Sequence, residues 1–419
     1  MKIMMIVGAR PNFMKAAPIL AAIAAHNQKL TKTATGEKLV CTLVHTGQHY
    51  DARMSDAFFS DLQMPHPDVF LGAGSGSHAV QTAEIMRRFE EVVLRENPDV
   101  VVVVGDVNST LACALVTAKI VLPGGQARPL IAHVEAGLRS FDRAMPEEIN
   151  RVLTDHLCDL LFVTEESGLR NLEREGVPQE RVFFVGNTMI DSLLKYKDQA
   201  DASPALDRLG LRVPAEKGKP AQIKPYALLT LHRPANVDDP ATFQEILAGL
   251  DELMSSHPVV FPAHPRTQKQ IEQCGLQSYF AGDTKADGSA SHVAPSAGIL
   301  MTGPQGYLDF LCLMKNARLV VTDSGGIQEE TTCLGVPCVT VRENTERPVT
   351  VECGTNLLAG VAQGGIRESI ARQLEARPGQ QAPYLWDGRA AERIVEILAR
   401  PLTAKEGAPD KILPSAIVR

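Results

Sequence analysis

The stretch Leu130–Arg151, LIAHVEAGLRSFDRAMPEEINR, contains an apolar run, a charged loop and the start of a helix. Its first residues predict a buried strand, and Glu135 is expected just past the end of that strand. Pro146 marks the first residue of the helix, because proline lacks only an N–H that would have no partner there. Glu147 then falls in the first helical turn. A strand followed by a loop and a helix is the repeating unit of α/β folds.

The acids of this stretch permit two interpretations. A carboxylate such as Glu147 at a helix N-terminus stabilises the helix dipole by about 0.3–1 kcal/mol, which is a sufficient structural reason for its presence. Glu135 follows a buried strand and precedes Ala-Gly, the place where α/β sheets bind their ligands. The pattern therefore favours a ligand contact for Glu135 and leaves Glu147 open between helix stabilisation and catalysis.

The same alternation of strand and helix continues through both halves of the chain. Apolar runs predict strands at residues 2–7, 39–45, 99–104, 130–134, 160–163 and 182–185, and again at 226–231, 259–261, 319–321 and 339–341. Two such series predict two doubly wound, Rossmann-like domains with an interdomain cleft. We expect a first domain at 1–197, a connection at 198–224 and a second domain at 225–387, with a C-terminal helix in 388–419 packing back on the first.

Length and composition limit the class of protein. A chain of 419 residues is too long for one ordinary core, which agrees with two domains. The net charge of −7 argues against a nucleic-acid surface. No apolar run reaches the ~20 residues that a membrane span requires. The eight cysteines form no CxxC pair, so we expect reduced thiols in a cytoplasmic protein, with no disulfide framework and no metal site.

Two short motifs are candidates for binding an anion. Lys15 falls near the start of a helix, where the dipole disfavours a cation, and Arg10 precedes it by five residues. Ser324-Gly325-Gly326 precedes another helix, and glycines let backbone N–H groups approach an anion at a helix N-terminus. Glu330, one turn into that helix, could accept hydrogen bonds from a ribose diol. Arg347 could bind a phosphate or form a surface ion pair.

Asp106 follows the most apolar strand, at the position where such sheets place functional residues, although an aspartate before a helix is by default its N-cap. Other nucleotide motifs are absent from the sequence. No GxGxxG follows the first strand, no GxxxxGK[ST] occurs, and no tyrosine has a lysine four residues later. The chain therefore lacks the glycine fingerprint and the Tyr/Lys pair of the dinucleotide-dependent sugar epimerases.

Together these motifs resemble the non-hydrolysing UDP-N-acetylglucosamine 2-epimerases, which share the GT-B fold of one glycosyltransferase superfamily. The matching segments are 8–11 with Lys15, 47–49, 105–106, 133–139, 146–151, 186–191, 232–236, 264–265, 322–330, 346–348, 387–388 and 392–394. They span the chain in the order found in the family. The resemblance implies an isomerase that needs no cofactor, forms a homodimer and supplies precursors for a surface polysaccharide.

The resemblance also implies roles for individual residues. Implied catalytic residues are Asp106, Glu135, Glu147 and His232. Implied UDP-sugar contacts are Arg10, Lys15, Arg139, His264, Phe310, Ser324, Gly325, Gly326, Glu330 and Arg347. Gln48 and His49 are implied regulatory residues. In the family's reaction, UDP is eliminated to leave a 2-acetamidoglucal and is added back after protonation on the other face.

The sequence departs from the family pattern in three places. Members activated by their own substrate have an acid in the HRxEN motif, where this chain has His232-Arg233-Pro234-Ala235-Asn236. Residues 140–146 look closer to archaeal members and to 2-epimerases of UDP-2,3-diacetamido-2,3-dideoxy-uronic acids. An extra loop is expected at 282–298. Such a uronic acid epimerase, a UDP-sugar glycosyltransferase of the same fold, a hydrolysing epimerase and a non-catalytic sensor remain alternatives.

Overall fold

The computed structural model describes residues 1–33, 37–48, 59, 61–213, 222–280, 298–375 and 382–400. These residues form two compact units. Within the described ranges, unit 1 comprises residues 1–48, 63–188 and 389–400, and unit 2 comprises residues 59, 61, 62 and 189–388. Each unit is built on a parallel sheet, so the predicted pair of Rossmann-like folds is confirmed.

The sheet of unit 1 has the strand order β3-β2-β1-β4-β5-β6-β7, and all of its neighbours are parallel. Its strands are β1 (Lys2–Val7), β2 (Val40–His45), β3 (Val69–Phe70), β4 (Val100–Val104), β5 (Leu130–Ala136), β6 (Leu160–Val163) and β7 (Val182–Phe184). The strand order reverses between β1 and β4. Such a reversal is the switch point at which doubly wound sheets bind ligands, beyond the carboxyl ends of the strands.

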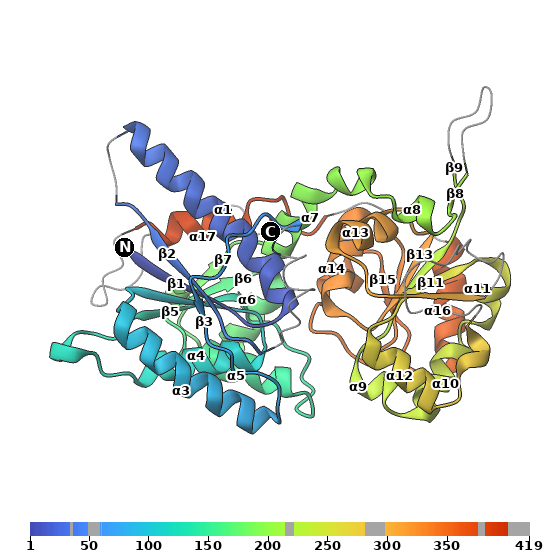
Figure 1. Ribbon diagram of the computed structural model, residues 1–419, viewed down its shortest axis with the longest axis horizontal. Helices are drawn as coiled ribbons and strands as arrows, with labels where there is room; N and C mark the ends of the chain where they lie inside the picture. The colour runs from blue at the N-terminus through green and yellow to red at the C-terminus, as the bar shows by residue number, and fades with distance from the viewer. Residues whose placement is uncertain are drawn as a thin grey trace. The chain divides into compact units, whose positions relative to one another are not determined.

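Helices cover both faces of this sheet (Figure 1). On one face lie α1 (Arg10–Thr33) and α17 (Ala390–Leu398), and on the other lie α3 (His78–Glu96), α4 (Asn108–Lys119) and α5 (Pro146–Leu157). The remaining elements are α6 (Glu166–Arg174) and the 3-10 turns η1 (Pro123–Gly125) and η2 (Gln179–Arg181). Because both faces are covered, the central strand VVVVV of β4 is buried at every residue.

Unit 2 repeats the design with the order β12-β11-β10-β13-β14-β15. Its strands are β10 (Ala227–Thr230), β11 (Val259–Pro262), β12 (Ile299–Thr302), β13 (Leu319–Thr322), β14 (Cys338–Thr340) and β15 (Asn356–Leu358), with an antiparallel ribbon of β8 (Arg212–Val213) and β9 (Gln222–Ile223). The order reverses between β10 and β13, which gives unit 2 a switch point of its own.

The helices of unit 2 also form two layers (Figure 1). Packed on the core of one face are α10 (Pro240–Ala248), α12 (Pro265–Gln273) and α16 (Gln363–Glu375), and on the other face lie α13 (Tyr307–Lys315) and α14 (Gly325–Leu334). Shorter elements are η3 (Gln199–Ala202), α8 (Ala205–Arg208), α9 (Pro234–Val237), α11 (Asp251–Ser256), η4 (Gln277–Tyr279) and α15 (Val349–Glu352).

The chain passes from unit 1 to unit 2 earlier than the domain boundary expected at residue 197. α7 (Thr188–Tyr196) belongs to unit 2 from Met189 onward. Tyr196 explains this placement, because its ring packs edge-on against Tyr307 at 6.0 Å and its hydroxyl donates to the carbonyl of Leu62 at 2.6 Å. At the other end, α17 returns to unit 1, where the guanidinium of Arg393 donates to the carbonyl of Val185.

Several elements differ from the sequence-based expectation. α1 begins at Arg10 instead of residue 13, so the expected loop at 8–12 is mostly helix. The short strands β3, β12 and β15 were not anticipated. The predicted insertion at 282–298 lies outside the described residues except for Gly298, and His49 lies outside them entirely.

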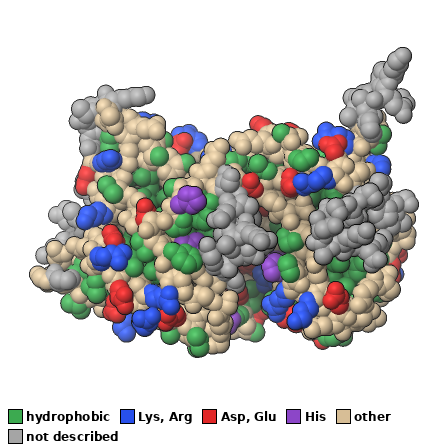
Figure 2. Space-filling model, in the orientation of Figure 1, with side chains coloured by type: hydrophobic (Ala, Val, Ile, Leu, Met, Phe, Trp, Pro, Cys, Tyr) green, Lys and Arg blue, Asp and Glu red, His purple; other side chains and the backbone are tan. Residues whose placement is uncertain are grey.

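The surface agrees with the composition. On the face shown in Figure 2, acidic and basic side chains are interspersed, as expected for a chain of net charge −7. Across the described residues, none of the helices combines the length and the apolar character needed to cross a membrane.

Candidate active site

Glu135 lies inside β5, whereas the sequence suggested a position just past the strand. β5 continues to Ala136, and its pairing with β6 shifts register between Val134 and Ala136. Glu135 has a φ of 78°, a left-handed conformation that costs a non-glycine residue about 1–3 kcal/mol. A bulge of this kind turns a side chain to a new direction at the end of a strand. Glu135 is 4% exposed and forms an ion pair with Lys15.

Lys15 is buried in α1, so it is not a solvated surface charge. The loop before it is fixed by Asn12, whose side-chain oxygen accepts from the N–H groups of Gly8 and Ala9. The amide of Asn12 donates to the carbonyl of Val104 at 2.9 Å, which ties this loop to the end of β4. β1, β4 and β5 therefore bring Lys15 and Glu135 together at the switch point of unit 1.

Asp106 follows β4 at the same edge of the sheet. Its carboxylate contacts the guanidinium of Arg151 at 2.5 Å, and the side chain of Asp106 remains 26% exposed. Arg151 is buried and also binds Glu148, at 2.6 Å. Asp106 is thus not a plain N-cap, because α4 begins after Val107 without a side-chain cap. Asp106 is a partly exposed carboxylate held by an arginine.

The two acids at the start of α5 have different environments. Glu148 is buried and accepts hydrogen bonds from the backbone N–H groups of Ser140 and Phe141. Burial opposes ionisation, but the hydrogen bonds from Ser140 and Arg151 hold the pKa of Glu148 below its ordinary value. Glu148 therefore shapes the loop before α5. Glu147 is only half-buried, which leaves its carboxylate accessible to a ligand.

His133 and Asp155 form a buried network that the sequence did not single out. The ring of His133 contacts the carboxylate of Asp155 at 2.6 Å and the carbonyl of Gly105 at 2.8 Å. Burial acts against ionisation of Asp155, yet the contacts with His133 and Arg139 lower its pKa below the ordinary value. Because Gly105 directly precedes Asp106, this network supports the turn that carries the candidate catalytic acid.

Arg139, a predicted substrate contact, belongs to this network instead. Its guanidinium is bound by Asp155 at 2.7 Å and by Glu175 at 2.7 Å, and its side chain is 1% exposed. These ion pairs hold Arg139 within the network, and its contact with the substrate stays a prediction. Gln48, a predicted regulatory residue, is likewise buried and accepts from the backbone and hydroxyl of Ser109 at the start of α4.

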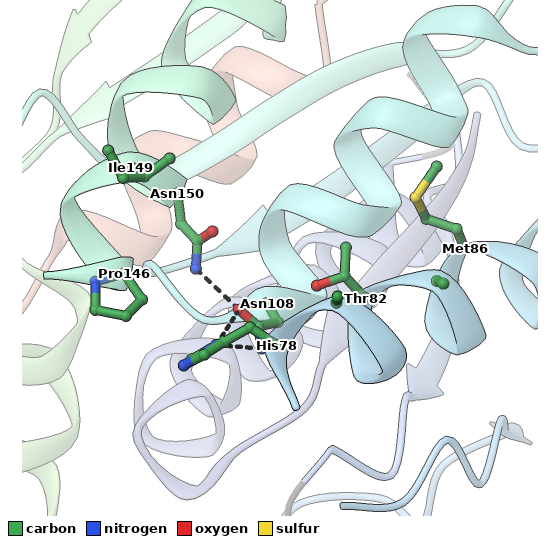
Figure 3. A pocket seen from close by; sticks show the side chains of 9 residues that line it. His78, Thr82, Met86, Asn108, Pro146, Ile149 and Asn150 are labelled. Carbon is green, nitrogen blue, oxygen red and sulfur yellow. Dashed lines mark hydrogen bonds between the residues drawn. The ribbon is translucent and has the colours of Figure 1, made fainter. Parts of the chain in front are cut away.

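A groove of about 530 Å³ opens between the N-terminal ends of α3, α4 and α5 (Figure 3). His78, Asn108 and Asn150 are directed toward one another in this groove, and Thr82 with apolar residues of α3 and α5 lines the rest. The amide of Asn150 donates to the carbonyl of Asp106 at 2.9 Å. The groove is therefore next to the loop of the candidate acid.

His232 in unit 2 follows β10, next to the switch point. Its Nδ1 lies 2.8 Å from a carboxylate oxygen of Asp323, which follows the neighbouring strand β13. The charge of Asp323 raises the pKa of His232 above the ordinary value. The His232 side chain is 57% exposed, and Nε2 is the ring nitrogen that remains for a ligand. Asp323 therefore stabilises the protonated form of this imidazole at the edge of the sheet.

Asp323 organises this region, although no role was predicted for it from the sequence. The buried carboxylate accepts from the backbone N–H groups of His232 and Arg233 and from the amide of Asn236. Burial opposes its charge, but the charge and the ring hydrogen bond of His232, together with the two backbone N–H groups, hold the pKa of Asp323 below the ordinary value. A recognisable signal was present, since Asp323 directly follows an apolar strand and precedes Ser-Gly-Gly.

Ser324, Gly325 and Gly326 form the N-terminal end of α14. Ser324 is the N-cap residue, but its side chain makes no capping hydrogen bond. The three residues are half-buried, so their N–H groups lie near the surface at the positive end of the helix dipole. A side chain at Gly325 would have its Cβ 2.6 Å from Arg347 Nη1 and 2.6 Å from Glu346 Oε1, so only glycine fits.

Arg347 was predicted to bind a phosphate directly. In the structure it is 5% exposed and binds Glu329 at 2.9 Å and Glu346 at 2.5 Å. Arg342 reaches Glu346 as well, at 2.7 Å. Arg347 is therefore a support packed behind the N-terminal turn of α14.

Glu330, predicted to bind a ribose, is buried in α14. Burial and the nearby charge of Glu329 raise its pKa to about 8. Among the described residues, Glu330 Oε1 and the Tyr307 hydroxyl are buried without a hydrogen-bond partner. Buried polar atoms without partners are rare in folded proteins, which is consistent with a ligand supplying the missing hydrogen bonds.

Replacing Glu330 by glutamine is expected to stabilise the protein at alkaline pH. The folded-state pKa of about 8 exceeds the ordinary value of 4.5, so Glu330 loses stabilising free energy as the pH rises between these values. Glu330→Gln removes that loss, and the free energy of unfolding at about pH 8 should rise by about 1 kcal/mol or more. Denaturant unfolding at pH 8 and pH 4 measures the difference. Exposed Glu368→Gln in α16 is the control, and an equal gain in both variants would contradict the assignment.

The two remaining candidates lie at the same edge of the second sheet. His264 follows β11, caps α12 and is exposed, and its Nδ1 accepts from the N–H of Arg266 at 3.3 Å. Phe310 follows β12 in α13 and is half-buried. The carboxyl ends of the neighbouring strands β10, β11 and β13 are thus followed closely by His232, His264 and Ser324, and Phe310 lies in the helix after β12. For Arg10, the structure describes only the backbone, at the start of α1.

Known proteins match this chain over nearly its whole length. The model of a protein family described as UDP-N-acetylglucosamine 2-epimerase matches residues 31–399. The chain belongs to the UDP-N-acetylglucosamine 2-epimerase family.

Two curated members of the UDP-N-acetylglucosamine 2-epimerase family and one solved structure illustrate the similarity. The UDP-N-acetylglucosamine 2-epimerase of Methanocaldococcus jannaschii is 39% identical over 95% of this chain and 99% of its own. The UDP-2,3-diacetamido-2,3-dideoxy-D-glucuronate 2-epimerase of Pseudomonas aeruginosa is 39% identical over 96% of this chain and 100% of its own. The M. jannaschii epimerase solved with UDP-GlcNAc and UDP has 39% identity and a TM-score of 0.79, and the match covers 95% of this chain and 99% of that one.

The family match confirms the resemblance that was drawn from the motifs. The similar solved structure confirms the predicted GT-B-type fold. The motif residues divide between the units. Unit 1 carries Asp106, Glu135 and Glu147, and unit 2 carries His232 with the N-terminal turn of α14.

Proposed function

We propose that this protein catalyses the reversible epimerisation of UDP-N-acetylglucosamine at C2 to give UDP-N-acetylmannosamine, without release of the free sugar. The observation that carries the proposal is the placement of the acid–base residues in a member of this family. Asp106 follows β4, and Glu135 lies at the end of the neighbouring strand β5. His232 follows β10 in the other sheet. The related epimerase solved with UDP-GlcNAc and UDP supports a UDP-sugar as substrate.

The chemistry requires a proton to leave C2, which is not adjacent to a carbonyl group. In the proposed reaction a carboxylate takes this proton while the bond between C1 and the phosphate oxygen breaks. The electron pair of the C–H bond becomes the C1–C2 double bond of a 2-acetamidoglucal, and UDP carries away the electrons of the C–O bond. Addition of UDP to C1 with a proton delivered to the opposite face of C2 gives the epimer. The sum is redox-neutral.

The residues of unit 1 suit the proton transfers. Glu135 is buried and fixed, which favours a defined direction of transfer. Asp106 and Glu147 are accessible carboxylates on different elements, so they can act on the other face of the sugar ring. We propose that these acids share the two proton transfers, each typically contributing about 10²–10⁴-fold to the rate.

The residues of unit 2 suit the departing UDP. The Asp323-supported imidazole of His232 can donate a proton or a hydrogen bond to a phosphate oxygen. The N-terminal turn of α14 offers backbone N–H groups to the diphosphate. Glu330 is placed one turn further, where a ribose diol can satisfy its unpaired oxygen. His264 and Phe310 line the same edge as further contacts for the nucleotide.

Sequence similarity does not distinguish between the two candidate sugars, which differ in their substituents. Identity to the UDP-2,3-diacetamido-2,3-dideoxy-D-glucuronate 2-epimerase, 39%, equals that to the M. jannaschii enzyme. A panel containing both UDP-N-acetylglucosamine and the diacetamido uronic acid compares the two substrates directly.

Incubation in deuterated water tests the proposal. With UDP-N-acetylglucosamine, proton NMR should show UDP-N-acetylmannosamine and the loss of the C2 proton signal from both recovered sugar nucleotides. Free N-acetylmannosamine with UDP would indicate a hydrolysing epimerase. Unchanged UDP-sugar with no deuterium at C2, for every member of the panel, would contradict the proposed reaction.

We also propose that the protein acts in the cytoplasm as a homodimer and supplies a precursor of a surface polysaccharide. The eight cysteines, all described, are free thiols, which suits a reducing compartment. Phe141 is 70% exposed and Leu153 is 47% exposed in unit 1, which is consistent with a surface that a second copy covers. The molar mass in solution, measured by light scattering, checks the dimer.

A further inference from the structure

Glu330 carries a carboxyl group that is enclosed within unit 2 without a counter-ion. The residue is 4% exposed and is the sixth of α14, beyond the first turn in which the helix dipole stabilises a negative charge. The adjacent Glu329 takes the nearby cation, because its carboxylate binds the guanidinium of Arg347 at 2.9 Å. Among the described residues, no cation offsets the burial of Glu330. Such a group is more stable as the neutral acid than as the anion.

The carboxyl group of Glu330 belongs to the helix face that carries Gly326. The two residues are four positions apart, so they are neighbours on the surface of α14. Helical side chains lean toward the N-terminus of their helix, and glycine adds no side chain at position 326. On this face, therefore, no side chain at 326 separates the Glu330 carboxyl group from the backbone N–H groups that begin α14.

Two buried oxygens in this region have no hydrogen-bond partner among the described residues. One is Glu330 Oε1, and the other is the hydroxyl of Tyr307, the first residue of α13. Tyr307 is 4% exposed. Burial, and then the charge of Glu330, raise the pKa of its hydroxyl, so the two groups lie near each other. Buried polar atoms nearly always have partners, so the two oxygens are suited to hydrogen bonds with a ligand.

The other ionisable groups near Glu330 do not neutralise a negative charge on it. Within α14 they are Glu329, whose own charge raises the pKa of Glu330, and Cys333, whose pKa is raised to about 11 mainly by burial. The Tyr307 hydroxyl stays protonated near pH 8, because its pKa lies well above the ordinary value. Lys197, which follows α7, acts on Cys333. Burial and the charge of Glu329 thus raise the pKa of Glu330 to about 8.

We propose that Glu330 is protonated in the free protein near neutral pH and releases this proton when the ribose of a UDP ligand binds to it. The inference rests on the proposed function, which supplies the UDP nucleotide. Both hydroxyls of a ribose diol can donate to one carboxylate, and such hydrogen bonds favour its charged form. The O–H bond of the acid breaks, its electron pair stays on the carboxylate, and the proton passes to water. UDP therefore binds more tightly as the pH rises toward the pKa of free Glu330, and its affinity levels off above that value.

Calorimetry in two buffers of different ionisation enthalpy counts the protons that UDP binding releases. At pH 7.5 the last phosphate ionisation, at about pH 6, is nearly complete, so the ligand adds little to the count. The wild type should release about half a proton or more beyond the number released by Glu330→Gln, which has no proton to give. Exposed Glu368→Gln in α16 is the matched control and should release as many protons as the wild type.

The affinity for UDP gives an independent measure of the same linkage. From pH 7 to pH 9 the dissociation constant of the wild type should fall by about tenfold relative to that of Glu330→Gln. Taking the ratio of the two proteins removes the titration of His232 and of the ligand, which both share. With 2′-deoxy-UDP, which keeps the phosphates but lacks one hydroxyl of the diol, the wild type should release fewer protons than with UDP.

Equal proton counts for the wild type and Glu330→Gln, or an equal pH dependence of their UDP affinities, would overturn the inference. Failure of the wild type to bind UDP would overturn it as well. A protein that shows this linkage but exchanges no C2 proton would contradict the proposed reaction and support the inference. C2 exchange without the linkage would support the proposed reaction and overturn the inference alone.

Discussion

Glu135→Gln will lower the rate of C2 proton exchange by about 10²–10⁴-fold, the usual contribution of a positioned acid or base. Glutamine has nearly the same shape as glutamate but cannot take up the proton. The affinity for UDP should stay near the wild-type value, because the residues proposed to hold the departing UDP, His232 and the N-terminal turn of α14, lie in unit 2. Deuterium uptake at C2 and UDP calorimetry on one preparation measure both quantities.

Exposed Glu173→Gln in α6 is the matched control for this variant, and it should exchange at the wild-type rate. Exchange by Glu135→Gln within about tenfold of wild type would remove Glu135 from the proton transfers. Asp106→Asn should also slow exchange strongly, because Arg151 holds that carboxylate at the same edge of the sheet.

Gly325→Ala will weaken UDP binding by about tenfold or more and destabilise unit 2. Its Cβ would lie 2.6 Å from both Arg347 Nη1 and Glu346 Oε1. These side chains are buried in an ion-paired cluster, so they cannot move aside freely. Overpacking of this kind costs about 1–3 kcal/mol and would shift the N-terminal turn of α14. Calorimetric titration with UDP and denaturant unfolding measure the two effects.

Gly364→Ala is the matched control, since nothing lies within 4 Å of a Cβ at that position in α16. This variant should bind UDP normally and be as stable as the wild type or more stable, because alanine suits a helix better than glycine. Normal UDP binding by Gly325→Ala would show that the N-terminal turn of α14 does not hold the nucleotide.

The sequence was sufficient for the main architecture because the buried parallel strands are nearly continuous apolar runs. β1 and β6 were predicted with their observed bounds, and β4 differs by one residue. β12 was missed because it follows a segment without clear periodicity, and β3 and β15 are too short for a pattern. The end of β5 was misplaced because no local signal in the sequence reveals a bulge at Glu135.

The candidate site was predicted less completely than the fold. Motif positions identified Asp106, Glu135, His232 and the turn at Ser324, and the structure places each at the carboxyl edge of a sheet. Sequence spacing could not show which charges neutralise one another across elements. Arg139 and Arg347 carry the right charge for a phosphate, but each is paired with two carboxylates, Arg139 with Asp155 and Glu175, and Arg347 with Glu329 and the adjacent Glu346.

Asp323 and Asp155 illustrate the opposite case. No role was predicted for either from the sequence, although Asp323 lies in the matching segment 322–330. Asp323 supports the candidate residue His232 through a buried contact, and Asp155 makes such a contact with His133. Supporting residues of this kind are defined by tertiary contacts, so a single sequence does not distinguish them from ordinary helix caps or surface acids.

In the proposed reaction, a carboxylate of this protein moves the C2 proton while UDP leaves from C1 and returns. The most direct test uses UDP-N-acetylglucosamine labelled with oxygen-18 in the bond between C1 and the β-phosphate, incubated in deuterated water. The account predicts that the label scrambles into the non-bridging β-phosphate positions as deuterium enters C2, and that Glu135→Gln suppresses both. Epimerisation with deuterium at C2 but with the label fixed in the bridging position would contradict it.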